Sequence, residues 1–481
     1  MVQELTGVVR RDTKGENLKR RPDNGDWRDA KRRKVVDPDN SAGIQYSKEE
    51  IDAEQKRPKR KVAVMVGYSG TGYKGMQVNN DEPTIERDLF RAFISAGAIS
   101  KANADDPRKV SLVRCARTDK GVHAAGNVIS LKLIIDDEDI VTKINDALPA
   151  QIRVWGIERT NNAFSCYQGC DSRWYEYLMP SYSLLPPHPQ TYLGKMVQEY
   201  AQKHGVEDDL KTKFADVETF WEEVEEKHIK PVLDSLDAKT RAKVLERMHD
   251  EAAAEAAEEG DQKEPTPQPE TVKFRDVDAD PSLAPGSKQP KGRTLTPLDF
   301  ALRDIKLAYV GAKRRYRISP ERLARLQEVL DLYTGTRNFH NYTVQKSPLD
   351  PSAKRHIKSF VVNPKPIIIG DTEWLSLKVH GQSFMMHQIR KMVGLASLVV
   401  RCGTPAERVT ESYGKQKIAI PKAPGLGLLL ERPVFESYNK KATEQLGKET
   451  IDFSKYEEKL EAFKQEHIYN RIFDVEEQEH A

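Results

Sequence analysis

The segment RCARTDKGVHAAG, residues 114–126, decides how the rest of the sequence is interpreted. It lies between VSLV at 110–113 and VISLKL at 128–133, and both stretches are predicted to be β-strands from their apolar, partly alternating pattern. A loop between two strands exposes polar side chains at a sheet edge, and Gly121 allows a sharp turn there. The side chains that crowd into seven residues of this loop are Arg117, Asp119, Lys120 and His123.

The carboxylate of Asp119 is the most informative group of the loop. A carboxylate flanked by cations stays ionised and can act as a nucleophile or a base. The same residues also fit an ordinary turn with surface charges, so the loop alone leaves both interpretations open.

Two other segments favour a site. SRWYEYLMPSY at 172–182 places Tyr175 and Tyr177 on one face of a predicted strand, where a ring can stack on a flat ligand. Packing at the edge of a core is the alternative for these tyrosines. In SFMMHQIRKMVG, His387 and Arg390 lie three residues apart on one face of a largely apolar helix. An arginine in such a helix needs a partner.

Outside these segments the chain alternates between predicted strands and helices. The predicted strands are 62–68, 152–158, 358–362, 374–381 and 425–431. The predicted helices are 83–99, 140–149, 319–335, 387–403 and 453–468. Each half combines strands with packing helices, so we predict an α+β architecture of two similar α/β lobes split by an insertion.

The predicted organisation has five parts. They are a disordered basic leader (1–58), an N-terminal catalytic lobe (59–182), an insertion that is charged and helical and then disordered (183–298), a C-terminal catalytic lobe (299–440) and a C-terminal helical extension (441–481). Within the leader, KRRK at 31–34 and KRPKRK at 56–61 match nuclear-import clusters. They predict a nuclear protein, with the cytoplasm and the mitochondrion as alternatives.

Composition narrows the class of protein. Of the 481 residues 38% are apolar and 31% charged, and no stretch approaches the roughly 20 apolar residues of a membrane-spanning helix. The net charge of +3 averages unlike parts: residues 216–280 carry a net −11, and the remainder carries +14. A basic body fits a protein that binds a polyanion, with solubility as the alternative reason for the charge.

The glycine and cysteine patterns give no cofactor site. GTGYKG at 70–75 has dinucleotide-type glycines, but no helix opens at the loop and no acidic residue follows at the expected distance. We expect a tight loop that approaches a ligand backbone instead. Four cysteines are too few for a disulfide framework and indicate a reducing compartment. Cys166 and Cys170 lack a second pair, so ligand spacing does not support a structural zinc.

Five motifs, taken in order, resemble a known family. They are GYSGTGYKGMQ, RTDKGVHA, SRWYEYLM, FMMHQIRKMVG and APGLGLLLE. Together they are similar to the TruA-type tRNA pseudouridine synthases, over about 60–182 and 299–437. Met76 stands where a tryptophan is usual, Lys120 replaces a small residue, and the insertion is large. These departures point to the eukaryotic branch and predict a monomer in place of the bacterial homodimer.

The resemblance implies a fold and a reaction. The pseudouridine synthase fold has two similar lobes that form a central mixed sheet with a cleft between them. Its members isomerise uridine to pseudouridine without a cofactor, breaking the C1′–N1 bond and forming C1′–C5. The implied substrate is tRNA, at the anticodon stem and nearby, with small nuclear RNA and messenger RNA as further candidates.

The resemblance also implies residue roles. Asp119 matches the essential aspartate, which acts as a nucleophile at C1′ or C6 or assists glycal formation. Arg390 matches its ion-pair partner, and Tyr175 matches the tyrosine that stacks on the uracil and takes the C5 proton. The expected RNA contacts are Lys74, Arg117, Lys120, His123 and His387. A non-catalytic RNA-binding module and a nucleotide-dependent oxidoreductase are the competing functions.

Overall fold

The structure, a computed structural model, describes residues 43–79, 82–248 and 296–479. The basic cluster at 31–34 and the proline-rich stretch after 260 lie outside the described residues. Residues 43–58, assigned above to a disordered leader, include the short helix α2 (Lys48–Asp52). Glu54 accepts a hydrogen bond from the backbone of Lys101 at 2.9 Å, and Arg57 donates one to Gly97 O at 3.0 Å. This part of the leader is therefore packed against the fold.

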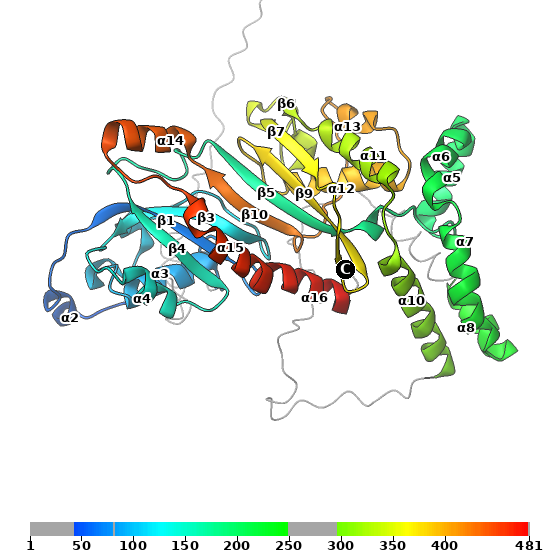
Figure 1. The fold of residues 1–481 in the computed structure, drawn as a ribbon, viewed down its shortest axis with the longest axis horizontal. Coiled ribbons are helices and arrows are strands. Elements are labelled where there is room, and N and C mark those ends of the chain that lie inside the picture. The colour runs from blue at the N-terminus through cyan, green and yellow to red at the C-terminus, as the bar shows by residue number, and fades with distance from the viewer. Residues whose placement is uncertain (1–42, 80–81, 249–295, 480–481) are drawn as a thin grey trace, which may run out of the picture.

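A single ten-stranded sheet forms the centre of the molecule (Figure 1). The strands of its path, in spatial order, are β4 (Ile152–Arg159), β1 (Arg60–Tyr68), β3 (His123–Leu133), β10 (Leu428–Val434), β5 (Ser172–Pro180), β9 (Thr372–Gly381), β7 (Lys354–Val362) and β6 (Gly335–Asn338). Off the path, β2 (Val113–Arg114) pairs with β3, and β8 (Ile367–Ile369) pairs with β9. Among the described strands, only β10 and β3 pair in parallel. The α+β class with a large mixed sheet is confirmed.

The middle of the sheet joins segments that are far apart in sequence. β10 lies between β3 and β5, so residues near 430 pair with residues near 123 and near 175. β5, which the predicted boundaries assign to the N-terminal lobe, pairs with β10 and β9. Tyr175 is opposite Leu430 on one side and Val379 on the other.

One face of the sheet is covered by helices at both ends. They are α3 (Ile85–Ser95) and α4 (Ile140–Asp146) over the β1 end, and α11 (Pro320–Asp331) and α12 (Gln388–Arg401) over the β9 end. In α3, Ile85, Leu89 and Phe93 recur every four residues and are buried. They pack with the alternate β1 residues Val62 and Val64 in one large core.

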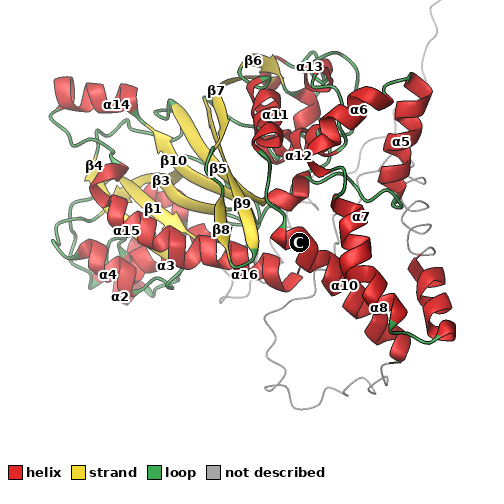
Figure 2. Ribbon diagram, turned by 45° about the vertical axis from the view of Figure 1, so that its right-hand side comes forward, coloured by secondary structure: helices red, strands yellow, loops and turns green. Residues whose placement is uncertain are grey.

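The opposite face is covered by the C-terminal segment, which runs along the sheet (Figures 1 and 2). Its helices are α14 (Glu436–Lys441), α15 (Glu457–Phe463) and α16 (Asn470–Glu479). Phe453, Leu460 and Phe463 are buried there with Met65 and Leu429 of the sheet. This segment is therefore a structural layer of the fold.

The inserted helices lie at the right of Figure 1, and the later ones form a separate small core. They are α5 (Tyr192–His204), α6 (Glu207–Phe214), α7 (Phe220–Val224) and α8 (Lys230–Asp234), which precede α10 (Pro297–Arg315). Val224, Ile229 and Val244 pack on Ala301 and Ile305 of α10. The short α13 (Glu407–Glu411) follows α12. Within the described ranges, no helix combines the length and apolarity needed to cross a membrane.

Candidate active site

The loop that carries Asp119 is fixed by a buried polar network. The side chain of Asn127, fully buried in β3, accepts a hydrogen bond from Ala116 N at 3.3 Å and donates one to Ala116 O at 3.1 Å. It also donates to the Tyr68 hydroxyl, which lies 2.9 Å from Thr118 Oγ1. Buried groups that are fully paired in this way hold one conformation.

Asp119 begins a tight turn. The Val122 amide donates to Asp119 O at 3.1 Å, and Gly121 has the left-handed φ of 72° that the turn requires. The Asp119 side chain is 36% exposed, so it remains open to a substrate while the hydrogen bonds at Ala116 and Thr118 fix the loop before it.

The glycine-rich loop at 70–75 packs against this turn. A Cβ atom at Gly70 would lie 2.4 Å from Val122 O, and one at Gly75 would lie 3.0 Å from Thr118 O. These glycines therefore permit close approach to the protein's own backbone. The expectation that they approach a ligand backbone is wrong at Gly70 and Gly75, because residues 118–122 occupy that space, whereas a Cβ atom at Gly72 would meet nothing within 4 Å.

His123 ties the two loops together. Its side chain has no exposed surface, and the Gly70 amide donates to its Nδ1 at 3.2 Å. Because Nδ1 accepts, the neutral ring carries its proton on Nε2. Burial lowers the pKa of His123 to about 4, against an opposing contribution from the Leu426 carbonyl. The predicted RNA contact of His123 is therefore wrong, since a buried neutral ring cannot reach a phosphate.

His387 brings the C-terminal half of the chain to Asp119. It precedes α12 with a φ of 63°, an unusual value for a residue with a side chain. Its Nδ1 lies 3.2 Å from Asp119 Oδ2, within ion-pair distance but not aligned as a hydrogen bond. Predicted as an RNA contact, this side chain lies beside the carboxylate instead.

Arg390 lies near the Asp119 turn without pairing with the carboxylate. Its Nε donates to Ala423 O at 2.7 Å, and a side chain at Gly425 would lie 3.6 Å from both the guanidinium and Lys120 O. Among the described ion pairs, Asp119 pairs with His387 and Arg390 does not take part. The predicted Asp119–Arg390 ion pair is therefore wrong. Arg390 donates to the Ala423 carbonyl instead, and His387 is the residue beside the Asp119 carboxylate.

Tyr175 lies on strand β5 of the central sheet. It is buried and meets Phe384 edge to face, with ring centroids 5.2 Å apart. Burial raises its pKa above the ordinary value, so the phenol keeps its proton at neutral pH. The next tyrosine on this face, Tyr177, donates to Pro424 O at 2.9 Å. Sequence reasoning missed Phe384, although the aromatic residue that opens FMMHQIRKMVG was a signal for it.

The remaining predicted residues lie on the loops around Asp119. Arg117 and Lys120 are exposed on either side of it, and Lys74 is exposed on the glycine loop that packs against Thr118. Cationic side chains at such positions suit phosphate groups. For a metal ion, the part of the chain that the structure describes contains no cluster of three or more His, Cys, Asp or Glu side chains.

Comparison with known proteins decides the family. A family model of tRNA pseudouridine synthases matches residues 329–436. The chain is 47% identical to tRNA pseudouridine synthase 1 of Candida glabrata over 88% of this chain and 69% of the relative. It is 44% identical to tRNA pseudouridine synthase 1 of Schizosaccharomyces pombe over 94% of this chain and 86% of the relative. The chain belongs to the tRNA pseudouridine synthases.

Membership of the synthase family confirms the predicted family and enzyme class. Pseudouridine synthases are isomerases, and their reaction needs no cofactor. A further relative, the tRNA pseudouridine(27/28) synthase of Saccharomyces cerevisiae, is 34% identical over 87% of this chain and 96% of its own length. Relatives with different names therefore share nearly the whole of this fold.

Proposed function

We propose that this synthase isomerises uridine to pseudouridine in tRNA, with Asp119 as the catalytic carboxylate. The supporting observation is that a partly exposed carboxylate on a fixed loop lies 3.2 Å from His387, which comes from the C-terminal half of the chain, three residues before Arg390. Relatives named tRNA pseudouridine synthase 1 support tRNA as the substrate. We extend the proposal to uridines in the anticodon stem and nearby, and to small nuclear RNA and messenger RNA.

The reaction requires a nucleophile, a ring that stacks on the base and a group that accepts one proton. The C1′–N1 bond breaks, the C1′–C5 bond forms, C5 loses a proton and N1 gains one, so atoms and electrons balance within the uridine. Asp119 supplies an electron pair to C1′ or C6, or assists glycal formation. The uridine must leave its helix first, since a stacked base hides these atoms.

Tyr175 suits the base-handling role. Its buried ring meets Phe384 edge to face, and a protonated phenol in an apolar setting can stack on uracil. Because the phenol is protonated, Tyr175 would first give its proton to the uracil whose N1 has left C1′ and would then take the C5 proton, which restores the phenol. Arg117, Lys120 and Lys74 are the side chains that we propose to hold phosphates of the extruded strand.

Two further properties belong to the proposal. The basic cluster at 31–34 supports a nuclear location, whereas the cluster at 56–61 ends in strand β1, where Lys61 is buried. The large insertion and the departures at Met76 and Lys120 support a monomer.

The test is Asp119→Asn, assayed by pseudouridine mapping and by binding of an unmodified tRNA transcript. The change removes the charge and keeps the size, so we expect turnover to be lost while tRNA affinity changes little. Asp136→Asn, on an exposed loop of the same half, is the matched control and should retain full turnover. If Asp119→Asn keeps more than about a few per cent of the wild-type rate, the carboxylate is not the nucleophile. If wild-type protein binds tRNA without modifying it, the RNA-binding module is the better assignment.

A further inference from the structure

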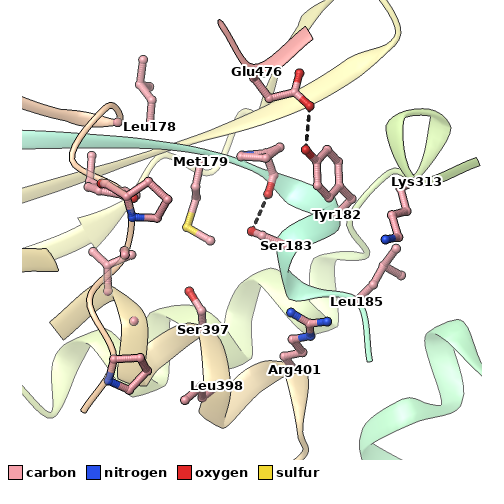
Figure 3. Close-up of a pocket in the computed structure, with 18 of the residues that line it drawn as sticks. Leu178, Met179, Tyr182, Ser183, Leu185, Lys313, Ser397, Leu398, Arg401 and Glu476 are labelled. Carbon is pink, nitrogen blue, oxygen red and sulfur yellow. Dashed lines mark hydrogen bonds between the residues drawn. The ribbon is translucent and has the colours of Figure 1, made fainter. Parts of the chain in front are cut away.

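A cavity lies on the other side of the loop that holds Arg390. Its volume is about 430 Å³, within the range of small-molecule sites (Figure 3). Residues of the end of β5, of α12, of loop 421–427 and of α16 line it. The catalytic side chains Asp119, Tyr175, His387 and Arg390 are not among the lining residues.

Loop 421–427 separates the cavity from the candidate active site. On the active-site side, Ala423 O accepts from Arg390 Nε and Pro424 O accepts from Tyr177 Oη. Pro421 through Pro424 also line the cavity. A ligand in the cavity is therefore distinct from the uridine that reacts at Asp119.

Two cations occupy one end of this cavity. Figure 3 shows Lys313 of α10 and Arg401, the last residue of α12, next to Leu185. Neither forms an ion pair with a carboxylate of the described residues, and the buried Arg401 Nε has no hydrogen-bond partner there. Burial lowers the pKa of Lys313, and the nearby charge of Arg401 lowers it further. Two neighbouring cations without an anion indicate an anion site.

The acidic group of the cavity is already used. Glu476 accepts a hydrogen bond from the Tyr182 hydroxyl at 2.6 Å (Figure 3). It also lies 3.6 Å from Arg314. It therefore leaves the positive end at Lys313 and Arg401 uncompensated.

The rest of the lining suits a flat, mostly apolar group. Aromatic and aliphatic side chains dominate it: Met179, Leu185, Trp221, Trp374, Val393 and Leu398. Trp221 also lies under Lys313, whose ammonium is 6.0 Å from the ring centroid. The hydroxyl of Ser397 adds a polar group within the apolar wall. A phosphate at one end and a flat aromatic ring at the other are the parts of a nucleotide.

We propose that this cavity binds a nucleotide, with its phosphate on Lys313 and Arg401 and its base against the apolar wall. The nucleotide belongs either to the RNA substrate, at a position other than the reacting uridine, or to the free nucleotide pool. The first source rests on the proposed function, whereas the phosphate and base chemistry is common to both.

The test uses the full chain and uridine 5′-monophosphate as the probe, with binding followed by tryptophan fluorescence. Lys313→Gln and Arg401→Gln remove one cation each, and Ser397→Phe fills the cavity. We expect each variant to weaken binding by about tenfold or more. The two glutamine variants lose a charge-assisted contact with the phosphate, and the phenylalanine variant loses the space for the ligand. Lys306→Gln, an exposed residue of α10 outside the cavity, is the matched control and should bind as wild type. Thermal unfolding of each variant verifies that the fold is retained.

A competition arm identifies the source. If saturating uridine 5′-monophosphate weakens binding of an unmodified tRNA transcript to wild type but not to Arg401→Gln, the cavity takes a nucleotide of the RNA. If the probe binds and tRNA affinity does not change, it takes a free nucleotide. Absence of probe binding to wild type, together with equal tRNA affinity in wild type and all three variants, overturns the proposal. Equal probe affinity in Arg401→Gln and wild type also overturns it.

This test is separable from the catalytic proposal. The Asp119→Asn protein should bind the probe as wild type does, because Asp119 does not line the cavity. Loss of turnover with intact probe binding therefore concerns the active site alone. Loss of probe binding with intact turnover concerns the cavity alone.

Discussion

At the scale of single residues, His387 combines a strained backbone with a functional contact. A left-handed φ costs a residue with a Cβ atom about 1–2 kcal/mol, and this one sets an imidazole beside the Asp119 carboxylate. His387→Gly relieves the strain and removes the ring. We expect the melting temperature to stay level or rise, while kcat falls by about 10- to 100-fold as Asp119 loses its orientation.

The matched control for that prediction is Ser111→Gly. Ser111 has a φ of 55°, lies at the end of a short 3-10 turn and is exposed. It should gain stability with unchanged kcat. Equal loss of kcat and of melting temperature in His387→Gly would mean that the residue supports the fold alone.

The sequence identifies the residues of this site better than their contacts. Asp119 and Tyr175 could be found because a charged loop and a strand with alternating tyrosines are local patterns. The contact of Asp119 with His387 depends on one backbone angle, which no residue pattern at 387 encodes. The prediction that Asp119 pairs with Arg390 rested on their opposite charges alone. It failed because the guanidinium donates to the Ala423 carbonyl, which comes from a loop 33 residues further along the chain.

At the scale of elements, His123 joins strand β3 to the glycine loop, and this junction should weaken in acid. The unfolded pKa of histidine is about 6.5, and burial lowers the pKa of His123 in the fold to about 4. The unfolded chain therefore binds the proton first. The free energy of unfolding should decrease as pH falls from about 6.5 towards 4, by up to about 1.4 kcal/mol per pH unit.

His123→Asn tests this dependence. Asparagine does not titrate and can still accept from the Gly70 amide. Urea unfolding at several pH values between 7 and 4 should therefore show a flatter profile than wild type. The exposed His204→Asn variant should keep the wild-type profile. Parallel profiles for wild type and His123→Asn would show that the buried ring does not control acid stability.

The limits of sequence-based prediction at this scale also have physical causes. Apolar periodicity predicted strands at 62–68 and 374–381, and both are present as β1 and β9. The strand predicted from 425 begins at 428, because the residues before it form the loop that accepts from Arg390 and Tyr177. The insertion of β10 between β3 and β5 is a long-range pairing that periodicity within one strand cannot show.

At the scale of the whole molecule, the C-terminal segment decides whether the sheet has a second covered face. Phe453, Leu460, Phe463, Ile468 and Ile472 are all buried against it. Burial of each such side chain stabilises the fold by about 1.5–3 kcal/mol. Losing all of them would therefore remove a free energy comparable to the whole unfolding free energy of a typical domain, about 5–15 kcal/mol. Removal of residues 441–481 should therefore leave an insoluble chain in expression trials, and removal of 477–481 should not. Soluble, active protein without residues 441–481 would contradict this role.

The insertion is anchored to the C-terminal half by one buried ion pair. Arg322 of α11 has no exposed surface. Its Nε and Nη2 donate to the two carboxylate oxygens of Asp216 at 2.9 and 2.8 Å. Its Nη1 donates to Leu184 O at 2.9 Å. Burial alone would raise the pKa of Asp216, but the hydrogen bonds from Arg322 and Ser319 outweigh it and lower the pKa. Stability from this pair is therefore present above about pH 4 and is lost as pH falls further.

Asp216→Ala leaves the Arg322 guanidinium buried without a counter-charge, so the free energy of unfolding should fall by about 3–5 kcal/mol in urea titrations at pH 7. Adding Arg322→Met should restore part of that loss, since an apolar side chain then replaces the stranded charge. Glu223→Ala removes an exposed pair with Lys227 in the same insertion and should change stability little. If Asp216→Ala unfolds at the same urea concentration as wild type, the ion pair does not contribute to stability. The apolar contacts of the insertion would then be what attaches it.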